Sequence, residues 1–254
     1  MKLSVGIITF NEEKIINKTL EAIKDIADEI IIVDSLSTDR TVEIAKELGA
    51  TIFSEEWKGF GPQKNSVIKK CKGDWILLLD ADEVVSAELR ERIIEVINSP
   101  DSNEVFKIKR SSICFGEKIK HGGWGSDYVI RLWKKGCVHI GEELVHERYI
   151  SSKPTRNIDH ILWHYTNFSI EKYFNKFNSY TTLGAAEYFK RGKKATFIKL
   201  YLSPLFKFIK DYFFRLGFLD GSIGFLLALT ASYSVYVKYL KLYLLQKEAR
   251  KSLS

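Results

Sequence analysis

Two aspartates and a glutamate stand close together in the segment LLLDADEVV, residues 77–85. Asp80 and Asp82 are two positions apart at the end of an apolar run, and Glu83 follows directly. Ionised carboxylates are costly to bury and repel one another at this spacing, so a positive partner must stand beside them. Carboxylate oxygens suit Mg²⁺ or Mn²⁺ bound beside substrate phosphates. The segment therefore predicts a divalent-metal site facing a phosphorylated substrate.

The same segment has a structural interpretation. Asp82 or Glu83 could cap the following helix, because carboxylates accept hydrogen bonds from the free N–H groups of a helix N-terminus. Two aspartates alone do not decide between a metal site and a cap. Their place after the fourth predicted strand of a sheet favours the metal.

The elements that must position these carboxylates are visible as a regular alternation. Apolar and β-branched runs at 3–9, 29–34, 50–54 and 74–80 are separated by capped amphipathic stretches. Strands and helices at this spacing predict a mostly parallel sheet covered by helices on both faces. Shorter β-like runs between 105 and 163 should complete the sheet. The predicted fold class is α/β, Rossmann-like, with a helical C-terminal extension.

Polar residues follow three of the predicted strands. In a parallel sheet the carboxyl ends of the strands meet at one edge, where ligands bind. The side chains expected to converge there are Thr9, Asn11, Asp34, Ser35, Ser37, Asp39, Asp80 and Asp82.

Three segments in this order, LSVGIITFNEE, IIIVDSLSTDRT and GDWILLLDADEV, resemble the nucleotide-binding half of glycosyltransferase family 2. Members are inverting enzymes of the A-type glycosyltransferase fold. The resemblance covers at least residues 3–85, and three linked motifs are more specific than any one of them. It implies a nucleotide diphosphate sugar as donor. The residues that it implies at the donor nucleotide are Thr9, Asn11, Glu12, Asp34, Ser35, Lys64 and Asp80.

The resemblance also implies individual roles. Asp34 would bind the uracil or ribose, Asp82 would hold Mg²⁺ or Mn²⁺, and Asp80 would contact the ribose or the metal. Lys64, in GPQKN, is similar to a basic residue near the nucleoside, although taken alone it is typical of a solvated lysine at a helix start. His164, in WHYT, is similar to a third metal ligand of some members, and its structural alternative is a hydrogen-bonded core histidine.

Later segments narrow the resemblance. GGWGSDYVIRLWKKG, ELVHE, HYTNFSIEKYFNKFNSYT and RLGFLDGSIGFLLA are similar to a bacterial subgroup that adds β-1,4-linked glucose to the lipopolysaccharide inner core. An inverting transfer needs a base near the acceptor hydroxyl. By resemblance, Glu147 is the predicted base and His146 the residue that orients it. The structural alternative for Glu147 is a surface ion pair with Arg148.

Trp124, Asp127 and Arg131 form the predicted acceptor side. An indole can stack on a sugar face, and an arginine can hold a phosphate or carboxylate through two hydrogen bonds. A tryptophan packed on the sheet and a surface ion pair account for the same residues equally well.

Charge is unevenly distributed along the chain. Residues 1–150 carry 22 basic and 26 acidic side chains, whereas residues 151–254 carry 17 basic and 6 acidic ones. The basic part predicts an acidic partner.

Three widely spaced cysteines favour neither disulfides nor a zinc site and fit a reducing compartment. The N-terminal MKLSVGIITFNEE lacks the pattern of an export signal, so a cytoplasmic location is expected.

The C-terminal part predicts long helices, one from about Ser169 to Arg191 and another opening at Ser203 and Pro204. Residues 221–237 are uncharged over 17 positions, short of the roughly 20 that a spanning helix needs. So many continuous apolar residues argue against a nucleic-acid partner. We expect peripheral contact with the anionic inner face of the cytoplasmic membrane. Packing against the catalytic domain or a second subunit is the alternative.

These features predict a catalytic α/β domain over 1–165 and a helical extension over 166–254 for acceptor, membrane or oligomer contact. The predicted function is metal-dependent, inverting transfer of a hexose, with UDP-glucose as donor, to a lipopolysaccharide inner-core or related glycolipid. Two alternatives are a polyprenyl-phosphate glycosyltransferase and a non-catalytic nucleotide-sugar-binding membrane scaffold.

Overall fold

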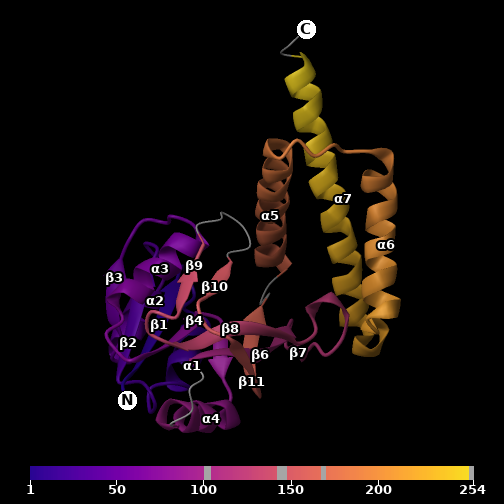
Figure 1. The fold of residues 1–254 in the computed structure, drawn as a ribbon. Coiled ribbons are helices and arrows are strands. Elements are labelled where there is room, and N and C mark those ends of the chain that lie inside the picture. Colours follow the sequence, from indigo (N-terminus) through magenta and orange to yellow (C-terminus); the bar gives the residue numbers. More distant parts are fainter. Residues whose placement is uncertain (100–103, 142–147, 167–169, 252–254) are drawn as a thin grey trace. The chain divides into compact units, whose positions relative to one another are not determined.

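The computed structural model describes residues 1–99, 104–141, 148–166 and 170–251 (Figure 1). The chain forms two compact units, Met1–Ser111 with Asp127–Tyr165, and Ser112–Ser126 with Thr166–Ser254. The predicted division into 1–165 and 166–254 differs from these units by one segment. Residues 112–126 belong with the C-terminal helices, because Cys114, Ile119 and Leu227 form a small apolar cluster there.

Four parallel strands form one half of the main sheet, in the order β3-β2-β1-β4 (Figure 1). Their bounds are β1 Leu3–Thr9, β2 Glu29–Asp34, β3 Thr51–Ser54 and β4 Trp75–Asp80. β1 and most of β2 and β4 are buried, which explains why their sequences are continuous apolar runs.

The other half of the sheet continues in the order β8-β6-β11-β5, with β7 beside β6. β8 pairs antiparallel with β4 and with β6, and β5 pairs antiparallel with β11. The bounds are β5 Glu83–Val85, β6 Val105–Cys114, β7 Glu117–Lys118, β8 Asp127–Lys134 and β11 Thr155–Thr166. A separate ribbon pairs β9 with β10, Val138–Ile140 with Tyr149–Ser151. The predicted α/β class is confirmed, and the later β-like runs do complete the sheet.

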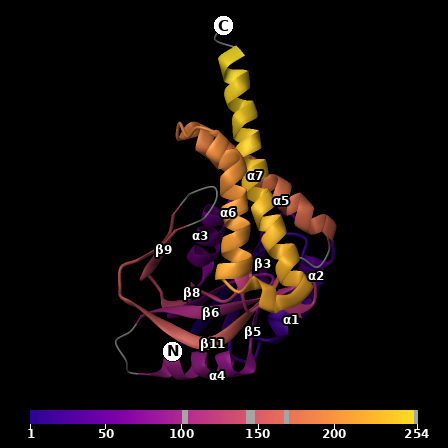
Figure 2. The same cartoon turned by 90° about the vertical axis from the view of Figure 1, so that its right-hand side faces the viewer.

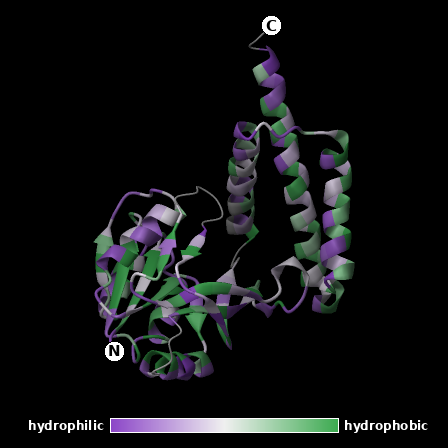
Figure 3. Ribbon diagram, in the orientation of Figure 1, coloured by the Kyte–Doolittle hydropathy of each residue, from purple (hydrophilic) through white to green (hydrophobic). Residues whose placement is uncertain are grey.

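Helices cover both faces of the sheet. Their bounds are α1 Ile16–Glu21, α2 Thr41–Glu47, α3 Phe60–Lys70 and α4 Ala87–Asn98. Successive strand residues point to opposite faces, so Leu3 and Ile7 of β1 join one core cluster with α1 and α4, while Ile8 joins another with Val67 of α3. Figure 3 shows the central strands as mainly hydrophobic. Burial of these two clusters holds the strand ends in place.

A glycine sets the position of α3. A Cβ built on Gly6 of β1 would lie 2.3 Å from Cγ1 of Val67. Any larger residue at position 6 would therefore push α3 away from the sheet. Because α3 packs so closely, the side chains of its first turns, including Gln63 and Lys64, are buried near the carboxyl edge of β1 and β4.

Three helices dominate the second unit (Figures 1 and 2), and α6 is the shortest of them. They are α5 Ile170–Lys190, α6 Ser203–Ile209 and α7 Gly221–Lys251. π-helical turns at Ile198–Leu202 and Lys210–Phe214 extend α6 at both ends, and 3₁₀ turns lie at Gly122–Trp124 and Gly217–Asp220. The helix start predicted at Ser203 and Pro204 is the start of α6, but the π-helical turn before it begins at Ile198. α7 packs along both α5 and α6.

One stretch of the described chain, Gly217–Lys251, is long and apolar enough to cross a membrane by length and composition alone. Its most apolar window has a mean hydropathy of 1.4, and 22% of that window is buried inside the protein. By itself this is weak evidence of a membrane segment.

Candidate active site

The predicted strand-end residues lie side by side at one edge of the sheet. In the register of the parallel strands, Thr9 of β1 is opposite Asp34 of β2, and Ile8 of β1 is opposite Asp80 of β4. The carboxylates that end β2 and β4 therefore flank the end of β1. This arrangement follows from the pairing of three apolar strands of similar length.

Asp34 is a buried carboxylate held by hydrogen bonds from the end of β1 and from its own loop. Thr9 Oγ1 donates to Asp34 Oδ1 at 2.9 Å, and the backbone N–H of Ser37 donates to Asp34 Oδ2 at 2.8 Å. The Ser37 hydroxyl donates to Oδ1 at 2.5 Å. These donors fix the orientation of a carboxylate that would otherwise be costly to bury.

The loop after β1 is fixed to the loop after β2. Asn11 has a φ of 55°, a left-handed conformation that asparagine tolerates better than most residues. Its Oδ1 accepts a hydrogen bond from the Thr38 N–H at 2.8 Å, and the Glu12 N–H donates to Thr41 Oγ1 at 2.8 Å. Ser35 Oγ accepts from Gln63 Nε2 of α3 at 3.2 Å. The ends of β1 and β2 and the first turn of α3 are thus linked by hydrogen bonds.

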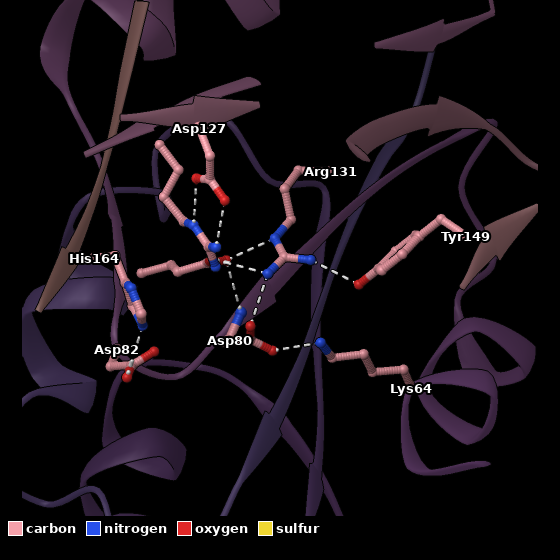
Figure 4. Close-up of polar contacts among 9 residues, drawn as sticks. Lys64, Asp80, Asp82, Asp127, Arg131, Tyr149 and His164 are labelled. Carbon is pink, nitrogen blue, oxygen red and sulfur yellow. Dashed lines mark hydrogen bonds and ion pairs between the residues drawn. The ribbon is translucent and has the colours of Figure 1, made fainter. Parts of the chain in front are cut away.

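Asp80 is held between two cationic side chains (Figure 4). Lys64 Nζ lies 2.9 Å from Asp80 Oδ1, and Arg131 Nη2 lies 2.7 Å from Asp80 Oδ2. Burial alone would raise the pKa of Asp80, but the charges of Lys64 and Arg131 outweigh it and hold the pKa well below its usual range. Lys64 and Arg131 are therefore the positive partners that the sequence predicted beside Asp80.

Glu83 is the centre of a buried network, and the expectation that it caps the next helix is wrong. It lies in β5 and accepts hydrogen bonds from Arg131 Nε at 2.7 Å and from Arg131 Nη2 at 2.8 Å. Arg110 Nη1 adds a contact at 3.3 Å. The cap of α4 is Ser86, whose Oγ accepts from the Leu89 N–H. A fully buried carboxylate without a cationic partner would be strongly destabilising, so Glu83 pairs with the two arginines rather than with the helix N-terminus.

The two remaining acceptor-side residues of the first unit lie around this network. Arg131 is 2% exposed, and its Nη1 donates to the Tyr149 hydroxyl at 2.6 Å. Asp127 accepts two hydrogen bonds from Arg110, at 3.1 and 2.9 Å, and half of its side chain is exposed. In this structure Arg131 faces its protein partners, whereas Asp127 is open to solvent.

Asp82, two residues after the end of β4, pairs with His164 of β11 (Figure 4). His164 Nε2 lies 3.3 Å from Asp82 Oδ2. Burial is the largest single influence on this imidazole and opposes its protonation. The charge of Asp82 and its hydrogen bond, with help from Glu83, outweigh burial, and the pKa of His164 is raised above 6.5.

We expect NMR titration to find the His164 imidazole protonated above pH 6.5. Because the folded-state pKa is the higher one, this pair stabilises the fold fully below about pH 6.5, and the contribution is lost as the pH rises through the folded value. Asp82→Asn removes the main raising influence, so the pKa of His164 should then fall. Asp25→Asn on the surface should leave the titration unchanged, and an unchanged titration in Asp82→Asn would contradict the pairing.

The donor atoms of Asp82 and His164 fit part of a divalent-metal site. A carboxylate oxygen and an imidazole nitrogen are both ligands of Mn²⁺, and such sites are commonly completed by substrate phosphates and water. Each oxygen of Asp80 is already engaged by a cation. Within the described ranges no group of three histidine, cysteine, aspartate or glutamate side chains is arranged for a metal. Asp82 and His164 are thus the residues that would hold the ion.

Three predicted site residues are not part of the contacts described above. Trp124 belongs to the second unit, where it packs against the cluster of Cys114, Ile119 and Leu227. Glu147 and His146 fall outside the described residues. The roles predicted for all three stay predictions.

Three residues of the site were not expected from the sequence: Gln63, Arg110 and Tyr149. Their partners Ser35, Glu83 and Arg131 lie 18 to 28 positions away along the chain. No local spacing signals such pairs. The one available sign was Glu83 itself, a charged residue inside the apolar segment LLLDADEVV.

Residues 4–178 match the family model for glycosyl transferase family 2. The matched region contains the strand-end carboxylates and the whole parallel sheet, so the protein is a transferase of the glycosyltransferase class. The chain belongs to glycosyltransferase family 2, and the resemblance noted in its sequence motifs is confirmed.

Relatives match along nearly the full chain. An uncharacterized glycosyltransferase of Rickettsia typhi is 32% identical over 98% of this chain and 89% of its own. The lipopolysaccharide core biosynthesis glycosyltransferase LpsC of Rhizobium meliloti is 29% identical over 99% of this chain and 95% of its own. Among solved structures, S. aureus TarS aligns with a TM-score of 0.47 and 20% identity, over 74% of this chain and 39% of that one.

Proposed function

We propose that this protein transfers a hexose, with UDP-glucose as the donor, to a hydroxyl of a lipopolysaccharide inner-core or related glycolipid, with inversion at the anomeric carbon. The observation that carries the donor half is the edge of the sheet, where Asp34 and Asp80 flank the end of β1 and Asp82 follows. The acceptor class is supported by the near full-length likeness to LpsC, whose name places that protein in lipopolysaccharide core biosynthesis.

Different residues at this edge of the sheet bind different parts of the donor. Asp34, held in one orientation by Thr9 and Ser37, accepts hydrogen bonds from the nucleoside. Lys64, paired with Asp80 at 2.9 Å, holds that carboxylate in place beside the nucleoside. Asp82 and His164 hold the divalent cation, which would neutralise charge on the departing diphosphate.

The acceptor side requires a base on the opposite side of the anomeric carbon from the diphosphate. Glu147 takes the proton of the acceptor hydroxyl in this proposal, and His146 orients it. Asp127, which is half exposed, would accept hydrogen bonds from the acceptor sugars. The reaction runs at the cytoplasmic face of the membrane that carries the glycolipid.

Asp34→Asn should weaken UDP binding about tenfold or more, because a buried charged acceptor contributes roughly 1.5–3 kcal/mol to a hydrogen bond. The same change leaves the Thr9 and Ser37 donors with a weaker partner, so binding must be measured on folded protein, by calorimetry with circular dichroism as a check. Glu43→Gln, on the exposed face of α2, is the matched control and should bind UDP normally. Equal affinities would remove Asp34 from the nucleoside site.

The structure bears on the polyprenyl-phosphate alternative at one residue. That alternative needs Arg131 to contact the acceptor phosphate, yet Arg131 is buried and engaged by Glu83, Asp80 and Tyr149. Releasing it would leave two carboxylates without their cation. This favours a glycolipid hydroxyl as acceptor over a lipid phosphate.

The stereochemistry of the product tests the proposed reaction. Incubation with UDP-glucose, Mn²⁺ and a solubilised inner-core glycolipid should give a β-linked glucose, recognised by the large anomeric proton coupling in NMR. An α-linked product would overturn the inverting mechanism. Transfer to a short polyprenyl phosphate alone would support the first alternative, and UDP binding without turnover on any acceptor would support the scaffold.

A further inference from the structure

The helix that includes α6 has one apolar face that lies open. From Phe197 to Phe214 it runs through both π-helical turns, and its exposed side chains are large and apolar. Phe206 is 62% and Phe214 76% exposed. The residues of this open face are Phe197, Ile198, Tyr201, Leu202, Leu205, Phe206, Phe213 and Phe214.

The opposite face of the same helix packs on α7. Pro204 is buried and its carbonyl accepts a hydrogen bond from Ser232 Oγ of α7 at 2.7 Å. The rings of Phe208 and Tyr212 lie edge-on to Phe225 of α7, with centroids 5.8 and 5.5 Å apart. These inward positions, 204, 208 and 212, repeat every four residues, and the exposed apolar side chains lie on the other side of the helix.

Basic residues surround the open face. Between 190 and 215 the chain has eight lysines and arginines and a single acid, Asp211. That acid is buried and paired with Lys207 at 2.7 Å and with Arg215 at 3.4 Å. Lys194 and Lys210 are exposed. Within the part of the chain that the structure describes, the surface around this face is therefore strongly positive.

We propose that the open face of α6 inserts into the headgroup layer of an anionic lipid bilayer, with the surrounding lysines on lipid phosphates. Exposed aromatic and aliphatic side chains beside lysines are the pattern of helices that lie in the plane of a membrane surface. Charge complementarity selects anionic lipid.

The lysines in the middle of α7 argue against a span by that helix. Lys241 Nζ donates to Asn178 Oδ1 at 2.7 Å, Thr181 Oγ1 at 2.9 Å and Thr182 Oγ1 at 2.7 Å of α5. Lys238 lies over the Tyr188 ring at 4.4 Å. α7 is bound to α5 and α6 through polar and aromatic contacts, as expected of a helix inside a protein unit that lies on a membrane.

The surface is inferred from the second unit alone and does not depend on the proposed reaction. Flotation of the full chain with vesicles tests it directly. Vesicles of equal parts phosphatidylglycerol and phosphatidylcholine should bind the protein, and vesicles of phosphatidylcholine should bind it at least about tenfold more weakly, because several lysines each contribute about fivefold. Raising the salt concentration should reduce the difference.

Two sets of variants separate the apolar and the charged contributions. Phe206→Ser with Phe214→Ser should weaken partition into anionic vesicles about tenfold or more. Lys194→Gln with Lys210→Gln should weaken binding to anionic vesicles about 25-fold and leave phosphatidylcholine binding unchanged. Ile94→Ser, at an exposed apolar position of α4, is the matched control and should change neither. All these positions are exposed, so melting temperatures should stay close to that of the parent.

Other outcomes would overturn the inference. A dimer in solution that the Phe206→Ser and Phe214→Ser changes dissociate, with no vesicle binding, would assign the face to a second copy of the chain. Resistance of the expressed protein to carbonate extraction would indicate a span. The phenylalanine variant should keep its UDP affinity and its transfer to a deacylated, water-soluble acceptor. If UDP does not bind at all, the proposed function fails while vesicle binding still decides the surface.

Discussion

Replacing Asp82 by asparagine is expected to lower the rate of sugar transfer about 10²- to 10³-fold, the range found when one electrostatic contact to a developing negative charge is removed. The substitution keeps the shape of the side chain and removes its charge. It weakens the hold on a divalent cation and also releases His164, which lies 3.3 Å away. The loss should appear in kcat more than in KM, because the diphosphate gains charge as the glycosidic bond breaks.

The experiment compares initial rates of transfer across a range of Mn²⁺ concentrations. Asp25→Asn, an exposed aspartate paired only weakly with Arg90 at 3.7 Å, serves as the charge-matched control and should retain full activity. Excess Mn²⁺ should rescue Asp82→Asn in part. Full activity of Asp82→Asn in the presence of EDTA would show that neither the carboxylate nor a metal assists departure of the diphosphate.

Replacing Arg131 by methionine is expected to reduce the free energy of unfolding of the first unit by about 3–5 kcal/mol, as when one partner of a buried ion pair is removed. Arg131 is the cation shared by Glu83 and Asp80. Glu83 is fully buried, and without Arg131 it keeps the Asp80 backbone N–H at 3.1 Å and a single cation, Arg110 at 3.3 Å. Methionine fills much of the same volume, and the cost therefore reports charge rather than packing.

Urea denaturation followed by tryptophan fluorescence measures this effect, since Trp57, Trp75, Trp133 and Trp163 all lie in the first unit. Arg40→Met, at an exposed ion pair, should cost within about 0.5 kcal/mol. Arg131→Met combined with Glu83→Leu should cost less than Arg131→Met alone, because both charges leave together. A cost below about 1 kcal/mol for Arg131→Met would indicate an arginine that is available to an acceptor phosphate after all.

Much of the fold could be predicted because its signals are local. β1, β2 and β4 are apolar runs of a length that strands favour, and their ends carry the polar residues that the sheet then brings to one edge. Once the strands were known to be parallel, the approach of Thr9, Asp34 and Asp80 followed from topology alone. The family motifs lie at these strand ends because ligands bind where the carboxyl ends of parallel strands meet.

The interior of the site could not be predicted, because its contacts are not local. Glu83 meets Arg131 48 positions later and Arg110 27 positions later, and only the antiparallel half of the sheet brings them together. The buried charge of Glu83 therefore looked like a helix cap. The segment 112–126 was placed with its sequence neighbours for a similar reason, since its apolar partner Leu227 lies in α7, about 100 positions away.

The proposed transfer is tested by measuring UDP release from a panel of UDP- and GDP-sugars in the presence of detergent-solubilised lipopolysaccharide cores truncated at successive sugars. Release from UDP-glucose should require one particular core, stop on addition of EDTA, and be lost in Asp82→Asn and in Glu147→Gln. Silence from every donor with every core, while UDP still binds, would contradict transfer to lipopolysaccharide and leave the polyprenyl-phosphate and scaffold functions in its place.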